Sequence, residues 1–472
     1  MTPPAWLEHV SAVAERGRAL LGRGAGGTNS TANLAATCSR LIARRGEASG
    51  LALATEVVRA LERMSASDAA EFLEVLAGSF SAPPDGVAAA VARWRTEPGD
   101  DAVMALAQAT EAPRQELFRR LNMVAGGAAA LVSLRGRLLP LLPLRPHLRG
   151  VDADLRHLLS SWFHGAFLRL EQINWETPAA TLERLIAYEA VHQIDGWGDL
   201  RLRLAADRRC FAFFHPLLPR EPLIFVEIAL TRELPTAIAP LLEVQRPIAE
   251  AGEAHTAVFY SISDCQPGLR GISFGNFLIK QVVRELSAEL PRLRTFATLS
   301  PVPSLAKAVA DRSNAGAFTD ERLYALTAGH HDELRRLASI GDELEALSRL
   351  LQAPGAHDPV VARIAGRLAL AHLVHVKVGG HIADSVGHFH LSNGARLERI
   401  NPDGDLSVVG MQSHGVMVNY VYEPQRLEVN HERYVRSSHV VTAPSLSGEI
   451  KAIDSAWSNT RRRDRRSARV AR

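Results

Sequence analysis

Cysteine and long apolar runs are both scarce in this sequence of 472 residues. Its three cysteines, Cys38, Cys210 and Cys265, are odd in number and far apart, which argues against a disulfide framework and against metal-ligand spacing. We therefore expect reduced thiols in a reducing compartment. No apolar run reaches the ~18–20 residues that a membrane span needs. The first residues lack the charged-then-apolar order of a secretory signal, and the last three match no peroxisomal tripeptide. These absences predict a cytoplasmic protein without a membrane partner.

Lysine is also scarce, and positive charge is concentrated at one end of the chain. The formal net charge is +3, and residues 461–472 hold seven Arg and one Asp. That segment alone carries +6, which leaves about −3 for the rest by the same count. An Arg-rich end can contact nucleic acid or anionic lipid, but a flexible, solubilising tail over 458–472 is the interpretation that we favour. Because the rest of the chain is not basic, we expect no nucleic-acid partner.

The chain is long enough for two or three domains, and its first part has helical periodicity. Residues 56–64 repeat apolar side chains three and four positions apart, and similar stretches continue to about residue 160. No cluster of His or Cys and no phosphate-binding loop occurs there, since the glycine-rich run 22–27 follows a helical pattern and is typical of a turn. We predict that residues 1–160 form a helical domain for assembly or packing.

The pattern changes near residue 205, where buried-type strands begin. A helix is predicted at 276–286 and further helices over 317–376, with strands again over 397–424. Strands that are first paired locally and then interrupted by helices indicate a mixed α/β or α+β domain over 161–457. The predicted strands of its first half are 210–214, 223–230, 257–262 and 294–299.

A glycine-rich segment, 266–280, lies between a predicted strand and a predicted helix. Glycines let the backbone approach a ligand closely, and the first helical N–H groups favour an anion such as a pyrophosphate. The segment is neither a Walker loop nor a dinucleotide fingerprint. It resembles the coenzyme A cradle of the N-acetyltransferase superfamily, while a plain strand–helix turn is an equally open interpretation. The candidate coenzyme A-binding residues are Arg270, Gly271, Ser273, Gly275, Asn276 and Lys280.

Two further residues are candidates on chemical grounds. His390 has the side chain whose ordinary pKa lies nearest neutrality, although the chain has 18 histidines and most are expected to serve packing or solvation. His388 lies two positions away, but no Cys or carboxylate set completes a metal site, so we expect none. Ser300 ends a predicted strand directly before a proline, which would hold it rigidly, and a simple turn serine is the alternative.

Several longer segments, taken together in this order, resemble the malonyl-CoA decarboxylase family. The similarity runs from about residue 161 to 436, and the helical part before it matches the family only in type. Several long motifs in one order are more specific than any single short pattern. The segments that carry the resemblance are 168–175, 188–192, 211–230, 259–263, 277–280, 298–303 and 389–395.

The resemblance implies a helical N-terminal domain and an acetyltransferase-like catalytic domain that converts malonyl-CoA to acetyl-CoA and carbon dioxide. It also implies that no metal or organic cofactor is needed and that the protein is a homo-oligomer, a tetramer or a dimer. The family's catalytic Ser and His map onto Ser300 and His390. A supporting Tyr maps onto Tyr422, and a supporting Ser maps onto Ser261.

The sequence departs from the family pattern at three places. Ser273 replaces a Glu of the animal members, segment 401–405 lacks the Trp usual after its Asn, and segment 372–388 is unusually rich in His. Two other functions therefore remain open. One is an acyltransferase that uses the same coenzyme A site, and the other is an inactive acyl-CoA-binding regulator, against which the intact Ser300 and His390 argue.

Overall fold

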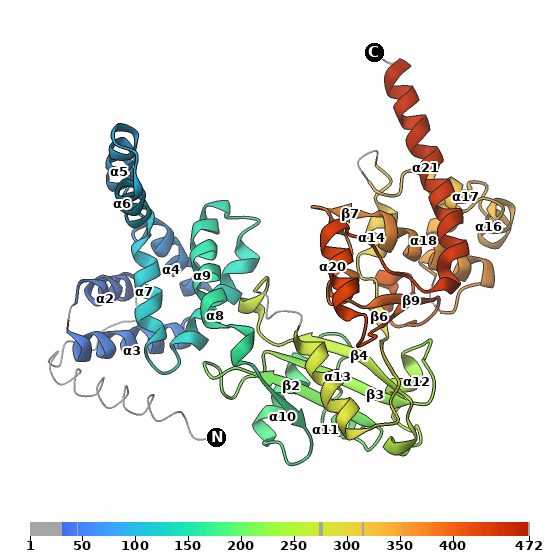
Figure 1. Ribbon diagram of the computed structural model, residues 1–472, viewed down its shortest axis with the longest axis horizontal. Helices are drawn as coiled ribbons and strands as arrows, with labels where there is room; N and C mark the ends of the chain where they lie inside the picture. The colour runs from blue at the N-terminus through green and yellow to red at the C-terminus, as the bar shows by residue number, and fades with distance from the viewer. Residues whose placement is uncertain (1–30, 45, 273–276, 314–315, 354, 471–472) are drawn as a thin grey trace.

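The computed structural model describes residues 31–44, 46–272, 277–313, 316–353 and 355–470, without the side chains of 277 and 459–470. Within these ranges a helical N-terminal region is followed by a mixed α/β domain, as Figure 1 shows. The fold class predicted from the sequence is confirmed. The glycine-rich run 22–27 lies outside the described residues.

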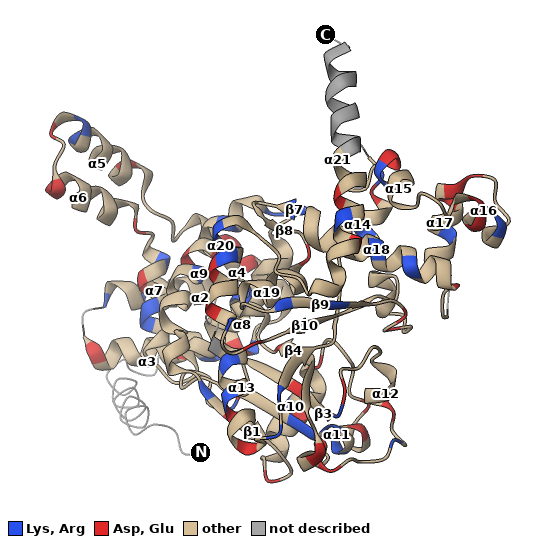
Figure 2. Ribbon diagram, turned by 45° about the vertical axis from the view of Figure 1, so that its right-hand side comes forward, with Lys and Arg blue, Asp and Glu red and all other residues tan. Residues whose placement is uncertain are grey.

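The N-terminal region consists of helices, most of which bury an apolar face. In α3 (Glu47–Arg63) the buried Leu51, Val57, Val58 and Leu61 recur at helical spacing, so one face of the helix packs inward. The hairpin formed by α5 (Pro84–Thr96) and α6 (Asp100–Thr110) instead projects from the body (Figures 1 and 2), and α5 has no buried residue. The helices are α2 Thr31–Ala43, α3 Glu47–Arg63, α4 Ala66–Gly78, α5 Pro84–Thr96, α6 Asp100–Thr110, α7 Pro113–Asn122, α8 Gly127–Leu138 and α9 Arg149–Trp162.

One mixed sheet organises the second part of the chain. Its strand order is β1-β2-β3-β4-β5-β10-β6, and β9 pairs with β10 on that strand's other side. The β4–β5 pair is parallel, whereas the other pairs are antiparallel. The strands are β1 Arg169–Ile173, β2 Arg208–Phe214, β3 Ile224–Thr231, β4 Thr256–Asp264, β5 Thr295–Thr298, β6 Ser300–Pro301, β9 Arg396–Asn401 and β10 Met417–Val421.

The sheet divides at the end of the parallel pair. The β4–β5 register ends at Phe259 opposite Thr298. Beyond this point β4 continues alongside β3, with a bulge at Tyr260, while β6 pairs with β10. Since bulges bend a strand and re-aim its side chains, the two neighbouring strands carry Ser261 and Ser300 onto separate branches of the sheet.

The two faces of the sheet are covered by different helices. On one face Phe211, Phe213 and Phe259 share a core with Val282 of α13 (Phe277–Glu289). On the other face Cys210, Ala212 and Phe225 pack against Leu182 and Leu185 of α10 (Ala179–Tyr188), next to α11 (Trp197–Arg203). Strand side chains alternate between faces, so residues adjacent in β2 enter different cores. The three cysteines are buried and free.

The N-terminal helices are docked onto the second domain through α8. Arg135 of α8 is buried, and its Nη1 donates to the carbonyl oxygens of Gly268 (2.7 Å) and Arg270 (2.8 Å). The Nε of the same side chain donates to Asp152 at 2.8 Å. A Cβ on Gly268 would lie 1.8 Å from the carbonyl oxygen of Val132, so this turn fits against the helix because position 268 is glycine. The helical region therefore holds the start of the glycine-rich segment.

Most of the remaining helices surround the β9–β10 half of the sheet, whereas α12 lies beside β3. The backbone of the last helix is helical to Val470, and the flexible tail from residue 458 stays a prediction. Trp457 anchors this helix, because its ring contacts Phe318 and His375. None of the described helices combines the length and apolar character that crossing a membrane requires. They are α12 Ala239–Leu242, α14 Leu305–Ala310, α15 Asp320–Leu326, α16 His331–Ala338, α17 Glu343–Leu351, α18 Pro359–His375, α19 Ser385–Ser392, α20 Leu427–Ser437 and α21 Ser447–Val470.

Candidate active site

Ser300 lies where the sheet divides. The amide of Leu299 still donates to the carbonyl of Phe259, and Ser300 itself is in register with Val418 of β10. Two residues later the amide of Val302 donates to Ser413 Oγ at 2.9 Å. Ser300 is buried, and prolines on both sides of Val302 restrict the backbone that follows it. The sequence thus places this hydroxyl on a rigid segment.

His390 reaches the same place from α19. Asp384 caps the start of this helix, since its side chain accepts from the amide of Gly387 at 2.8 Å. The His390 ring is buried and stacks on Tyr420, with ring centroids 4.8 Å apart. Its orientation is therefore fixed by an aromatic neighbour on β10 as well as by its own helix.

Ser300, His390 and Tyr422 form one buried hydrogen-bonded set, which we call the Ser–His–Tyr triad. Ser300 Oγ lies 3.0 Å from His390 Nε2, and the Tyr422 hydroxyl lies 2.7 Å from His390 Nδ1. Tyr422 directly follows β10, and its amide donates to the carbonyl of Phe296 on β5. Three chain segments that are far apart in sequence thus meet at one imidazole.

The triad is set in apolar surroundings, and this decides its charge. Burial lowers the pKa of His390 to about 3 and raises the pKa of Tyr422 well above its ordinary value. Both ring nitrogens of His390 face hydroxyl groups. Near pH 7 the imidazole is therefore neutral in the free protein, with one nitrogen donating and the other accepting.

The buried neutral histidines predict acid sensitivity. Burial also lowers the pKa of His215 to about 4. A folded-state pKa below the unfolded value of ~6.5 contributes stability that is complete above pH ~6.5 and is lost as the pH falls towards the folded value. We expect the free energy of unfolding to fall below pH ~6.5 by up to ~1.4 kcal/mol per pH unit for each such group. In urea unfolding at pH 4 to 7, His390→Gln should reduce this slope, and an unchanged slope would contradict the assignment.

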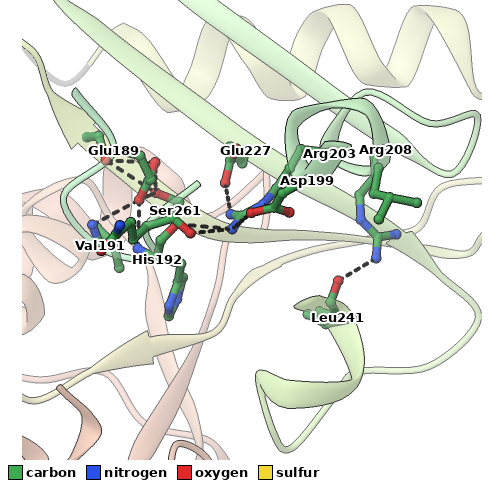
Figure 3. Close-up of polar contacts among 12 residues, drawn as sticks. Glu189, Val191, His192, Asp199, Arg203, Arg208, Glu227, Leu241 and Ser261 are labelled. Carbon is green, nitrogen blue, oxygen red and sulfur yellow. Dashed lines mark hydrogen bonds and ion pairs between the residues drawn. The ribbon is translucent and has the colours of Figure 1, made fainter. Parts of the chain in front are cut away.

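Ser261 belongs to a different cluster, which Figure 3 shows. Its hydroxyl contacts both carboxylate oxygens of Glu189, at 2.8 and 2.9 Å, and Ser263 Oγ also donates to Glu189. The amides of Val191 and His192 donate to the same carboxylate. Among the described residues no hydrogen bond joins Ser261 to the triad, so the structure does not bring it together with Ser300.

A buried ion pair holds the loop that follows Glu189 in place. Arg203 of α11 donates to Glu227 on β3 at 2.8 Å and to the carbonyls of His192 and Gln193, each at 3.1 Å (Figure 3). The loop that carries Glu189 is therefore tied to the sheet from two sides. Sequence reasoning gave Glu189 no role, although it lies within the segment 188–192 that carried the resemblance.

The predicted coenzyme A segment is described only in part. Ser273, Gly275 and Asn276 lie outside the described residues. Gly271 has φ +76° and nothing within 4 Å of its Cβ position, and Arg270 is exposed. Lys280 on α13 pairs with Glu428 on α20, so it sits at the junction between the two halves of the domain. The phosphate-binding role of this segment stays a prediction.

The described part of the chain contains no cluster of side chains suited to binding a metal ion. No three His, Cys, Asp or Glu side chains there come close enough together to hold an ion. His388, which neighbours His390 in sequence, instead directs Nδ1 to the hydroxyl of Tyr434 at 2.8 Å. The two histidines therefore have different partners.

Comparison with known proteins gives one consistent family. The model of the malonyl-CoA decarboxylase C-terminal domain matches residues 166–460, and that of the N-terminal domain matches residues 80–163. The mitochondrial malonyl-CoA decarboxylase of Mus musculus is 34% identical over 410 residues, which cover 81% of this chain and 81% of that protein.

Two solved structures match this chain over nearly their whole length. Malonyl-CoA decarboxylase from Rhodopseudomonas palustris is 44% identical, with a TM-score of 0.79, and covers 88% of this chain and 99% of that one. The enzyme of the same name from Agrobacterium vitis is 44% identical at the same coverage, with a TM-score of 0.72.

Proposed function

The chain belongs to the malonyl-CoA decarboxylase family, and from this premise we propose that the Ser–His–Tyr triad is where carbon dioxide is lost from malonyl-CoA. One observation carries the proposal: Ser300 Oγ lies 3.0 Å from His390 Nε2, and a buried tyrosine hydroxyl holds the other ring nitrogen at 2.7 Å. This gives a hydroxyl and an imidazole a fixed geometry in a low-dielectric site. Such preorganised donors are what a developing oxyanion requires.

The reaction breaks the bond between C2 and the malonyl carboxylate. Its electron pair moves into the thioester carbonyl, which leaves carbon dioxide and an enolate. Ser300 orients the malonyl group through its hydroxyl, and the apolar surroundings weaken the solvation of the carboxylate, which favours the loss of carbon dioxide. C2 then takes a proton and the product is acetyl-CoA.

His390 delivers that proton in our proposal, and its burial gives the step a direction. The free imidazole is neutral because its pKa is lowered to about 3. A bound malonyl carboxylate brings a negative charge near the ring, which raises the pKa of His390 and favours imidazolium in the complex. Carbon dioxide departs as a neutral molecule, so the negative charge stays on the enolate, and the proton then passes from Nε2 to C2. Tyr422 holds Nδ1 throughout.

The glycine-rich segment would hold the coenzyme A pyrophosphate in this proposal. Arg135 binds the carbonyls of Gly268 and Arg270, which fixes the start of this segment against α8. Arg270 and Lys280 supply positive charge, and Gly271, Ser273, Gly275 and Asn276 complete the predicted contacts. Lys280 would exchange its Glu428 partner for phosphate. Glu189 keeps Ser261 in a supporting position on the neighbouring branch of the sheet.

Incubation with malonyl-CoA alone tests the proposal. We expect acetyl-CoA and carbon dioxide in equal amounts with no acceptor present, measured by chromatography of the acyl-CoA species and by trapping labelled carbon dioxide. An acyltransferase on the same fold would release carbon dioxide only as a side reaction and would consume an amine acceptor. Binding of malonyl-CoA without turnover would identify an inactive regulator and contradict the proposal.

We also propose a homo-oligomer, a tetramer or a dimer, located in the cytoplasm. The projecting α5–α6 hairpin supports assembly, because it leaves the apolar side chains of Trp94, Val103 and Met104 exposed. Three free buried thiols are consistent with a reducing compartment. Light scattering of the purified chain measures the oligomeric state directly.

A further inference from the structure

Asp384 is a fully buried carboxylate beside the triad, and its two oxygens bind two different chain segments. Oδ1 accepts from the amide of Gly387, in the first turn of α19. Oδ2 accepts from the amide of Ser304 at 3.2 Å and from its hydroxyl at 2.7 Å. None of its surface is exposed to solvent. A buried carboxylate with this many donors is held in one orientation.

These two segments are the ones that carry the reacting pair. Ser304 lies four residues after Ser300, on the same proline-restricted segment, and Gly387 lies three residues before His390 in the same helix. One carboxylate therefore joins the backbone that positions the Ser300 hydroxyl to the helix that positions the His390 ring. The distance of 3.0 Å between Ser300 Oγ and His390 Nε2 depends on how these segments are set against each other.

The surroundings of Asp384 leave this junction little freedom. Ser304 Oγ is also 2.7 Å from His372 Nε2 on α18, so the hydroxyl that donates to Asp384 accepts from this imidazole. A Cβ on Gly387 would lie 2.8 Å from the Leu373 side chain and 2.9 Å from the Tyr420 hydroxyl. Tyr420 is the ring on which His390 stacks. A chain of contacts thus runs from α18 through Ser304 and Asp384 to the face of the His390 ring.

We propose that Asp384 is a positioning residue for decarboxylation, which sets the alignment of Ser300 with His390 by binding both of their segments. This rests on the function proposed above for the triad. An ordinary helix cap would satisfy the amide of Gly387 alone and would influence stability. The added bonds to Ser304 are what link Asp384 to turnover, because reacting groups displaced by about 1 Å can lose on the order of 10²-fold in rate.

Asp384→Asn is the first test, since it keeps the side-chain shape and the acceptor for Gly387 but replaces Oδ2 by an amide that cannot accept from Ser304. We expect kcat to fall by about tenfold to hundredfold, with KM for malonyl-CoA and the affinity for coenzyme A changed by less than about twofold. Asp342→Asn is the matched control. Asp342 caps α17 through the amide of Glu345 at 2.7 Å and is exposed, so the same change there should leave kcat unaltered.

A double-variant cycle separates positioning from a general loss of structure. If Asp384 acts through His390, adding Asp384→Asn to a His390→Gln enzyme should change the residual kcat by less than about twofold. Ser304→Ala, which removes one donor and creates no new group, tests the same link if Asp384→Asn folds poorly, and it should show the same lack of additivity.

Two results would overturn the inference. One is a wild-type kcat in both folded variants, Asp384→Asn and Ser304→Ala. The other is a loss of kcat in these variants that multiplies fully with the loss caused by His390→Gln. Neither concerns the proposed function itself. A wild-type enzyme that releases no carbon dioxide, or a His390→Gln enzyme at the normal rate, would remove the proposed function whatever Asp384 does.

Discussion

Turnover of malonyl-CoA is expected to fall by ~10²–10⁴-fold in His390→Gln, the range that the removal of a general acid usually costs. Glutamine keeps a polar side chain of related size, so it can still face Ser300 and Tyr422, but it cannot deliver a proton near neutrality. The loss should appear in kcat, with little change in the affinity for coenzyme A, because His390 is buried among the triad rather than placed on the glycine-rich segment. Steady-state rates and coenzyme A titration measure the two quantities separately.

His388→Gln is the matched control for this variant. It makes the same chemical change two positions earlier in the same helix, where the side chain is only partly buried and binds Tyr434 instead of the triad. Its turnover should stay within about twofold of wild type. A His390→Gln enzyme with a rate near that of His388→Gln would rule out His390 as the proton donor and leave Ser300 and Tyr422 to be tested as the reacting groups.

Local sequence patterns predicted most of the elements, because each pattern reflects the element's own burial. The run 223–230 is apolar except for Glu227, and β3 occupies Ile224–Thr231 with its residues buried up to the last one. The strand predicted at 257–262 became β4, Thr256–Asp264. By contrast β1, α10, α11, α19 and α20 were not predicted. Strand β1 is mostly exposed or half-buried and therefore has no strong apolar signal.

Contacts between distant segments could not be read from the local pattern. The placement of Tyr422 against His390 spans 32 positions, and it was expected only from the family resemblance. The separation of Ser261 from the triad depends on where the parallel strands part and on the bulge at Tyr260, both of which are set by pairing with other strands. Glu189 had no chemical signal of its own, because its role comes from donors on β4.

The histidines of segment 372–388 have packing and hydrogen-bond partners in the described part of the chain. His372 stacks on Phe318 and hydrogen-bonds to Ser304, and His375 stacks on Trp457 of α21. His381 and His388 lie against each other and against Tyr434. These residues brace the helices around His390, so this departure from the family pattern strengthens the frame of the triad without adding a group to it.

Gly268→Ala is expected to destabilise the protein and to displace the turn that begins the glycine-rich segment. The Cβ would lie 1.8 Å from the carbonyl oxygen of Val132 and 2.7 Å from the carbonyl carbon, and backbone atoms of a helix cannot yield as a flexible side chain does. The turn must move away from α8, which also breaks the bond from Arg135 to the Gly268 carbonyl. Overpacking of this kind costs about 1–3 kcal/mol or more in the free energy of unfolding. If the turn forms the coenzyme A site, displacing it should lower the affinity for coenzyme A by about tenfold or more. A tenfold loss corresponds to ~1.4 kcal/mol of binding free energy.

Gly136→Ala is the control on the opposite side of the same contact. Its Cβ would lie 3.4 Å from the amide nitrogen of Gly268, an ordinary contact distance, and alanine in a helix interior is favoured over glycine by ~0.5–1 kcal/mol. Gly136→Ala should therefore unfold at the same or a higher denaturant concentration and bind coenzyme A normally. If Gly268→Ala matched it in both urea unfolding and coenzyme A titration, the helical region would not be holding the turn. If Gly268→Ala lost stability but kept its coenzyme A affinity, the pyrophosphate would have to lie elsewhere, because a displaced turn cannot present the same amides.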